Sequence, residues 1–578
     1  MISARSDREA ARMTRQGLFC VLCLLVILFA LGLFDLISGD IWWHLRTGQL
    51  IRERVAVPQV DWFTYTNPNA RWIDLHWGFQ VITSWLWDLG GEWLLVAFKA
   101  SCAVVTFAIC FTISAGNSSV WHRIICWLPC ILLFSSRYLV RPELFSFLFL
   151  AATLAILHHS RRHPRLLWLL PVVQVLWVNV HALFVLQYIV VGAFMVDRAW
   201  CCFRRGPNAS EPSTNLTFIG LCISLPVCGL INPYGLDGLL FPLTLLEKVQ
   251  GTDRSFFYSF SPELRGIASF VGEYGWIVLF DRWQFLVAVL MLSLALMASV
   301  TNLVQGRGLP GRVLLLLVFG YLAWQMQRNL SVFSIIVGTV FSLDLTELTA
   351  GQVMLRRKGS RRHLAAAFSS VVAISLLIIL AAASVTGDVQ RFLSRTPQRH
   401  AMDTSAWRGQ DAMTFLEGDG MPDHIYAVGE RLAARCIFYL GPEKRVFADA
   451  RLELNSRQTL EDYLNIQFQL PAGDPAAEQT LKRYGNGQLP ALAFDNMLML
   501  NFSVDEPRLF QGLLRNPRWV CAFSTTSDDL YSGEAKDLVD GVTVFLHVTT
   551  ANKLGLKAAP VSQLLTFADA YRRDRLAR

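Results

Sequence analysis

Long apolar stretches dominate the first 390 residues and predict membrane-spanning helices. About 20 apolar residues in a helix cross the roughly 30 Å hydrocarbon core of a bilayer. Single passes are predicted at residues 17–37, 92–114, 120–136, 142–158, 215–231, 276–302 and 364–386. A polar, Trp-rich loop at 38–77 follows the first pass, and a short interfacial helix is expected at 78–88.

Two further apolar stretches are too long for one crossing. As single helices, residues 166–200 and 312–346 would each be about 50 Å long. Each is bordered by basic residues at both ends and contains a polar break, near Asn179–His181 and near Gln325–Asn329. Each is therefore predicted to be a two-pass hairpin, and the total becomes about eleven transmembrane helices.

Composition and charge agree with a polytopic membrane protein. Of the 578 residues, 53% are hydrophobic and only 17% are charged, which excludes a disordered chain and an ordinary soluble enzyme. The first 400 residues carry a net charge of +12 and the remainder −4. The basic excess thus belongs to the membrane part, where loop orientation and membrane lipids explain it, and no nucleic-acid partner is implied.

The distribution of basic residues predicts the topology. Arginines precede the first pass, and basic clusters lie at 161–165 and 356–362. The positive-inside rule then places residues 1–16 in the cytoplasm as an uncleaved N-terminus. We expect a transmembrane domain over 17–386 in the plasma (inner) membrane and an extracytoplasmic domain over 387–578.

The last 190 residues have a different pattern. Short strand-like runs alternate with helical patterns from residue 411 to residue 548, which is typical of a small α/β domain. Strands are expected at 424–429, 445–449, 492–495, 520–524 and 542–548, and helices at 411–416, 430–440, 459–469 and 506–514. If the domain is extracytoplasmic, Cys436 and Cys521 are available to pair.

With this topology, the polar residues that interrupt apolar sequence gather on the outer side. Ionisable groups at membrane depth cost free energy and therefore indicate function. Arginines on the outer side also run against the positive-inside rule, so we expect an anion to bind them. The candidates are Asp40, His44, Asp61 and His76 in the first outer loop, Arg137, Arg141 and Glu143 at the second turn, His181 at the third, and Arg328 and Asn329 at the fifth.

Several of these residues also fit purely structural roles. Asp40 follows Gly39 and is placed to cap a helix. Arg137 and Arg141 are placed to snorkel to lipid headgroups. In the last domain, Asp449 and Arg451 at a strand end fit either a ligand site or a surface ion pair, and we expect the ion pair because exposed pairs are common.

Several motifs resemble the GT-C superfamily of polytopic membrane glycosyltransferases. They are an acidic residue after the first membrane helix (Asp40-Ile41-Trp42-Trp43-His44), Pro58-Gln59-Val60-Asp61, Arg141-Pro142-Glu143-Leu144-Phe145 and Asn232-Pro233-Tyr234-Gly235. The acidic pair of the protein mannosyltransferase branch and the Trp-Trp-Asp motif of oligosaccharyltransferases are absent. The resemblance implies transfer of a sugar from a polyprenyl-phosphate-linked donor to an unknown acceptor.

The residue chemistry fits such a reaction. Asp40 is the candidate base for the acceptor hydroxyl, and the three arginines are candidates to stabilise the leaving phosphate. The remaining polar residues are candidates to orient substrate. No cofactor is required, although a divalent metal held by His44, Asp61, His76 or His181 stays open.

Two other function classes also stay open. One is a transporter or flippase of a lipid-linked or anionic solute, against which the sequence offers no matching inverted halves. The other is a non-catalytic binding or assembly protein whose outer domain does the work.

The topology is testable with reporter fusions. Fusions after residue 390 should report the extracytoplasmic side, because eleven passes starting inside end outside. Fusions within 161–165 and 356–362 should report the cytoplasm. A cytoplasmic signal from fusions after residue 390 would move every candidate residue to the wrong side of the membrane for this account.

Overall fold

Contacts within the chain divide it into two units. The computed structural model describes residues 15–34, 36, 38–114, 119–205, 212–251, 253–260, 262–353, 360–393, 407, 409–496, 506–525 and 541–558. We call Met1–Leu36 with Leu86–Asp403 the membrane unit, and Ile37–Trp85 with Thr404–Arg578 the sheet unit. Most of the predicted cytoplasmic N-terminus, part of the basic cluster at 356–362 and the tail from 559 lie outside the described residues.

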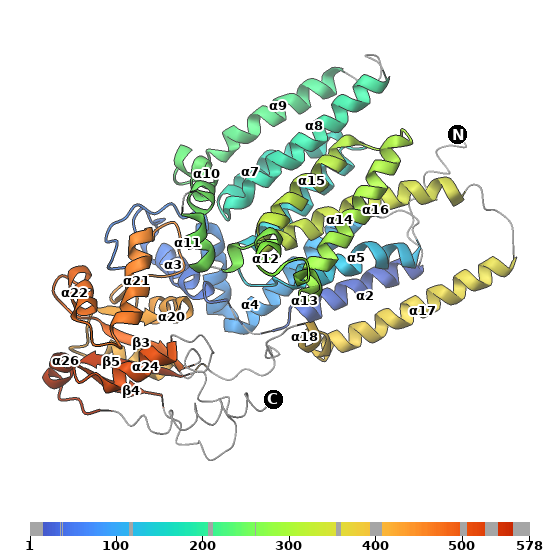
Figure 1. Cartoon of the computed structure of the whole chain (residues 1–578). Helices are drawn as coiled ribbons and strands as arrows, with labels where there is room; N and C mark the ends of the chain where they lie inside the picture. The colour runs from blue at the N-terminus through green and yellow to red at the C-terminus, as the bar shows by residue number, and fades with distance from the viewer. Residues whose placement is uncertain are drawn as a thin grey trace. The chain divides into compact units, whose positions relative to one another are not determined.

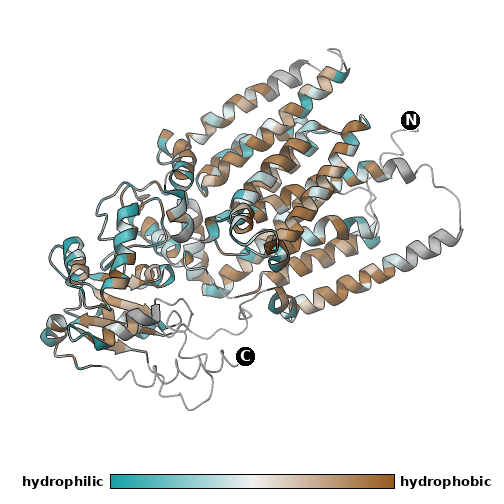
Figure 2. Cartoon of the chain, in the orientation of Figure 1, coloured by the Kyte–Doolittle hydropathy of each residue, from teal (hydrophilic) through white to brown (hydrophobic). Residues whose placement is uncertain are grey.

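The membrane unit consists of apolar helices at all the predicted spans (Figures 1 and 2). Its long helices are α2 (Arg15–Leu31), the second half of α4 (Trp77–Ile113), α5 (Val120–Ser135), α6 (Glu143–His159), α7 (Leu169–Val178), α8 (Val185–Arg205), α9 (Pro212–Gly229), α14 (Trp283–Val304), α15 (Pro310–Gln325), α16 (Leu330–Val353) and α17 (Ser360–Val385). Within the described residues, four helices are by themselves long and apolar enough to cross a membrane. The exact number of crossings stays a prediction.

Both predicted hairpins are confirmed as pairs of helices. Helices α7 and α8 are separated at Asn179–Phe184, where the 3-10 turn η2 (Ala182–Phe184) lies. Helices α15 and α16 are separated by the 3-10 turn η5 (Gln327–Asn329). The polar breaks are therefore reversals, as the length argument required.

The interfacial helix and the second span are joined but kinked. Helix α4 runs from Trp77 to Ile113, yet Gly90 and Gly91 have non-helical dihedral angles. Gly91 has a φ of 58° and a ψ of −145°, a conformation that only glycine adopts readily. The predicted interfacial helix and the predicted span are thus two helices that differ in direction and are joined by a kink within α4.

Two loops contain helices that the sequence pattern did not predict. The first outer loop holds α3 (Ile41–Arg54), and residues 232–274 hold α10 (Leu236–Gln250), α11 (Arg254–Phe260) and α12 (Ile267–Tyr274). Helix α3 is polar overall, and α10 contains Pro242. Polarity and an internal proline masked the helical period, because hydropathy reading detects continuous apolar runs.

The sheet unit contains a five-stranded mixed sheet with the order β2-β1-β3-β5-β4. The strands are β1 (His424–Val428), β2 (Arg445–Val446), β3 (Ala491–Asp495), β4 (Trp519–Ser524) and β5 (Val542–His547). Strand β1 pairs in parallel with β2 and β3, and β5 pairs antiparallel with β3 and β4. All five lie where the sequence predicted them, although β2 is shorter.

Helices surround this sheet in the positions that the sequence indicated. They are α19 (Gln410–Glu417), α20 (Glu430–Leu440), α21 (Arg457–Gln469) and α24 (Glu506–Arg515), with α22 (Pro475–Tyr484) and the short α26 (Val548–Lys553) unpredicted. Cys436 and Cys521 are buried and free. The possible disulfide between them is not formed.

The first outer loop is built into the sheet unit. Thr64 forms a parallel bridge with Val446. The Val446 N–H donates to the Phe63 carbonyl at 2.9 Å, and the Tyr65 N–H donates to the Val446 carbonyl at 3.1 Å. Sequence analysis assigned the loop to the membrane domain, whereas the structure groups it with residues 404–578. A single polar loop gave no signal of a pairing partner almost 400 residues away.

Candidate functional site

The arginines predicted at the second turn form an ion-pair cluster at one end of the membrane unit. Arg137 and Arg141 lie in the turn between α5 and α6, and Glu143 is the first residue of α6. The Arg137 guanidinium forks onto Glu143, with Nε 3.2 Å from Oε2 and Nη2 3.4 Å from Oε1. An acidic residue in the first turn of a helix is also favoured by the helix dipole.

A second carboxylate, from a distant segment, completes the pairing. Glu263 lies in the 3-10 turn η4 (Pro262–Leu264). Its Oε2 accepts from Arg137 Nη2 at 2.9 Å and from Arg141 Nη1 at 2.8 Å. One carboxylate oxygen therefore bridges two guanidinium groups.

Arg328 and His181 join this cluster electrostatically. The Glu143 carboxylate interacts with Arg328 and His181 as well as with Arg137 and Arg141. His181 Nδ1 lies 2.7 Å from Ser146 Oγ, which also accepts from Trp177 Nε1 at 2.8 Å. Five predicted residues from three turns thus lie near one another, namely Arg137, Arg141, Glu143, His181 and Arg328. We name Arg137, Arg141, Arg328, Glu143 and Glu263 the arginine cluster.

Close backbone packing places Arg328. The Gln327 N–H donates to the Arg265 carbonyl at 2.9 Å, so η5 is fixed to the segment after η4. A Cβ on Gly266 would lie 2.2 Å from the carbonyl carbon of Gln325, so only glycine permits this approach. Asn329 Nδ2 donates to the Leu322 carbonyl at 2.9 Å, which caps the end of α15. Asn329 therefore has a structural contact of its own beside its predicted substrate role.

The arginine cluster holds more positive than negative charge. It contains three guanidinium groups and two carboxylates. Within the described residues, Arg137 and Arg141 pair with these carboxylates, whereas Arg328 has no carboxylate oxygen within 4 Å. A buried or half-buried guanidinium is costly without an anionic partner. The cluster is therefore suited to accept an anion.

Electrostatics favour the charged forms of Arg137 and Glu263. Burial alone would lower the pKa of Arg137, but Glu143 and Glu263 outweigh it and raise that pKa. Burial raises the pKa of Glu263, but Arg137 and Arg141 outweigh it and lower the value to about 2. A carboxylate with a lowered pKa is protonated only when the pH falls toward that value. Glu263 is thus charged at any physiological pH.

The candidate base lies in the sheet unit. Asp40 occupies the N-cap position of α3, but its side chain makes no capping hydrogen bond and its backbone is helical (φ −63°, ψ −29°). A capping residue normally has extended dihedral angles and accepts from the helix N-terminus. The structure therefore does not support the capping interpretation of Asp40, and a catalytic role stays a proposal.

The two loop histidines lie near each other in the sheet unit. Buried His44 has its Nδ1 3.3 Å from Gln80 Nε2, and its ring centroid is 5.6 Å from that of His76. His76 Nδ1 lies 3.4 Å from the Asp74 carboxylate. Among the described residues, no group of three His, Cys, Asp or Glu side chains is arranged to hold a metal ion.

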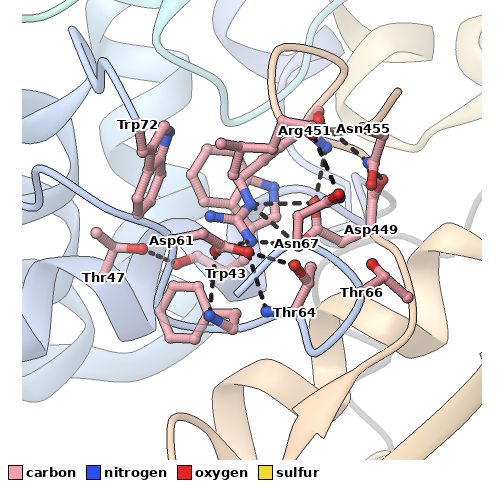
Figure 3. A network of polar contacts seen from close by, with 12 residues as sticks. Trp43, Thr47, Asp61, Thr64, Thr66, Asn67, Trp72, Asp449, Arg451 and Asn455 are labelled. Carbon is pink, nitrogen blue, oxygen red and sulfur yellow. Dashed lines mark hydrogen bonds and ion pairs between the residues drawn. The ribbon is translucent and has the colours of Figure 1, made fainter. Parts of the chain in front are cut away.

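Asp61 belongs to a buried ion-pair network (Figure 3). Its carboxylate accepts from the N–H groups of Phe63 and Thr64, both at 3.1 Å, and from Arg451 Nη2 at 2.8 Å. Arg451 Nε lies 3.0 Å from both oxygens of Asp449. Asp61 is 2% and Arg451 1% exposed. Placed in this way, Asp61 holds the first outer loop to the sheet.

The expectation of a surface ion pair at Asp449 and Arg451 was wrong. Arg451 is enclosed by aromatic rings, with its Cζ 4.4 Å from the Trp72 centroid and 5.2 Å from that of Phe63. Burial would lower the pKa of Arg451, but Asp449 and Asp61 outweigh it and raise that pKa. Asp61 could not be recognised from the sequence as the second partner of Arg451, because 390 residues separate the two.

Sequence reasoning missed one member of the arginine cluster. Glu263 was not predicted as a site residue, because it lies in a polar segment without a motif. The available signal was the charge balance, since two neighbouring outer arginines require a carboxylate from elsewhere. Because Asp40 and the arginine cluster lie in different units, their meeting stays a prediction.

Comparison with known proteins gives matches among solved structures. No protein-family model and no curated protein matches the chain. A solved oligosaccharyltransferase from Archaeoglobus fulgidus aligns with 85% of this chain and 72% of its own, at 12% identity and a TM-score of 0.47. ArnT from Cupriavidus metallidurans aligns with 94% of this chain and 98% of its own, at 12% identity and a TM-score of 0.46.

At these identities and TM-scores the two likenesses carry no argument about the family, activity or substrate of this chain. The proposals below rest on the residues of this chain.

The buried network makes a stability prediction. Arg451→Met leaves Asp61 and Asp449 as neighbouring buried carboxylates, so the free energy of unfolding should fall by about 3–5 kcal/mol. Arg457→Met is the matched control, because Arg457 forms an exposed pair with Glu461 and its loss should change stability by less than about 0.5 kcal/mol. Chemical unfolding of the full chain in detergent measures both. Equal effects of the two substitutions would contradict the network's role.

Proposed function

We propose that the chain is a membrane glycosyltransferase. It transfers a sugar from a polyprenyl-phosphate-linked donor to an acceptor hydroxyl on the extracytoplasmic side. The observation that carries this proposal is the arginine cluster, in which Arg328 has no carboxylate oxygen within 4 Å among the described residues. Lipid phosphates lie at the membrane surface, where helix reversals also lie, and guanidinium groups match them in charge and geometry.

The reaction follows from charge development. The acceptor oxygen attacks the anomeric carbon of the sugar, and the bond from that carbon to the phosphate oxygen breaks. Asp40 takes the hydroxyl proton. The donor's phosphodiester carries one negative charge, whereas the phosphate monoester that leaves carries about −1.5 to −2 at pH 7. Arg328, Arg137 and Arg141 are the groups that would stabilise this added charge, which is stabilisation specific to the transition state.

Asp40→Asn tests the proposed base. The substitution keeps the size of the side chain but removes the proton-accepting charge, so turnover should fall about a hundredfold or more. Donor binding should be nearly unchanged, because the phosphate contacts belong to the arginine cluster. Turnover and donor Kd in reconstituted protein measure the two effects.

The exposed Asp388, paired with Arg391, supplies a matched control. Asp388→Asn should leave turnover unchanged. Full activity of Asp40→Asn at normal expression would remove Asp40 from the mechanism. Donor binding without turnover in the unmodified chain would instead favour a non-catalytic binding protein.

Arg328→Ala should act mainly on binding. Loss of a charged hydrogen-bond donor to phosphate should weaken donor affinity about tenfold or more. Arg328→Lys should recover only part of the loss, because an ammonium lacks the planar fork of a guanidinium. Arg391→Ala, which removes an exposed cation, serves as the control in the same binding assay. Unchanged donor affinity in Arg328→Ala would contradict a phosphate contact at this residue.

A further inference from the structure

Glu263 differs from the other members of the arginine cluster in exposure and in the segment that carries it. Its side chain is 42% exposed, whereas those of Arg137 and Arg141 are 9% and 16% exposed. It lies on a short 3-10 turn, while Glu143 begins a long helix and is 14% exposed. Glu263 is therefore the carboxylate that can leave the cluster at the least cost in packing.

The contacts of Glu263 are those that a phosphate oxygen would make. A single oxygen, Oε2, accepts from Nη2 of Arg137 and from Nη1 of Arg141 at 2.9 and 2.8 Å. Two guanidinium groups that converge on one oxygen form a site for an oxyanion. Glu143, in contrast, receives the fork of Arg137 with both its oxygens and holds that side chain in place.

We propose that Glu263 is an internal substitute for the phosphate of the ligand. Its carboxylate occupies the phosphate subsite between Arg137 and Arg141, and an entering phosphate displaces it. This inference rests on the proposed function for the identity of the phosphate as a lipid headgroup. It adds a residue that sets the affinity of the site, because the ligand binds only in competition with Glu263.

Charge accounting shows what the exchange achieves. With Glu263 in place, the cluster carries a net charge of +1, counting three arginines and two glutamates. Once Glu263 has moved out, the net charge is +2. A monoanionic phosphodiester neutralises half of this charge, and the departing monoester neutralises nearly all of it. Displacement of Glu263 therefore favours the charge distribution that develops during transfer.

The test is a binding measurement on the full chain in neutral-lipid nanodiscs, with a polyprenyl monophosphate as the probe. Glu263→Gln keeps the size of the side chain and removes the competing charge, so the affinity should rise at least about fivefold. Glu263→Asp keeps the charge but is one methylene shorter and bridges the two arginines less well, so a smaller rise is expected. Because these are two independent variants, the failure of one to fold does not end the test.

Glu273 provides the matched control. It is a glutamate of the same segment, 46% exposed and paired with Arg265. Glu273→Gln should leave the affinity unchanged. Equal gains in Glu263→Gln and Glu273→Gln would indicate a general loss of negative surface charge and would overturn the proposal.

The remaining arms separate the ligand sources and the two proposals. Inorganic phosphate and phosphatidylglycerol are tested at the same concentrations. Glu263→Gln should raise the affinity for these two probes by a smaller factor than the affinity for the polyprenyl monophosphate. An equal rise in affinity for inorganic phosphate would indicate a site for free phosphate. If the unmodified chain binds the polyprenyl monophosphate but Glu263→Gln does not bind it more tightly, Glu263 is a structural ion pair and the proposed function stands. If the unmodified chain binds none of the probes, the proposed function fails with it.

Discussion

Three guanidinium groups at one end of a bundle of apolar helices must find negative charge. Removing arginine from water without a partner costs more than a helix bundle can easily offset, so the surrounding chain is arranged to supply carboxylates. Glu143 comes from the same turn as Arg137 and Arg141, and Glu263 comes from a segment 120 residues further on. The tight approach of Gly266 to Gln325 fixes the reversal that carries Arg328. Two carboxylates do not balance three arginines, and that imbalance underlies the functional account.

Pairing of buried arginine with carboxylates also organises the sheet unit, but there the carboxylates outnumber the arginine. There one guanidinium, that of Arg451, faces the two carboxylates of Asp449 and Asp61, and all three are buried. Nothing in this arrangement is exposed to a ligand. It joins the first outer loop to the edge of a five-stranded sheet (Figure 3). This loop carries Asp40 at the start of α3. Arg451 is thus a positioning residue for the segment that holds the candidate base.

The sequence predicted those features that depend on local pattern. Continuous apolar runs located the spans, and chain length required the reversals at Asn179–His181 and Gln325–Asn329. Alternation of strand and helix patterns located all five strands. Helices α3 and α10 were not predicted, because α3 is polar overall and Pro242 interrupts the apolar run of α10. The placement of Arg137, Arg141, His181 and Arg328 on one side followed from the predicted order of helices and turns, whereas their meeting with Asp40 stays a prediction.

Partners far apart in sequence were not predictable in the same way. Two ion pairs join residues more than one hundred positions apart, Asp61 with Arg451 and Glu263 with Arg137. No motif at either residue of a pair indicates its partner. The burial of Asp449 and Arg451 was also not predictable, since two charged residues at a strand end are typical of a surface ion pair. Burial depends on the aromatic residues Trp72 and Phe63 of the first outer loop, which only the fold brings there.

The most direct test is an experimental density map of the chain in a bilayer that contains a polyprenyl monophosphate. The account predicts phosphate density whose oxygens lie within hydrogen-bonding distance of the guanidinium groups of Arg137, Arg141 and Arg328. Lipid phosphate bound elsewhere, with the arginine cluster unchanged and unoccupied at saturating lipid, would contradict it.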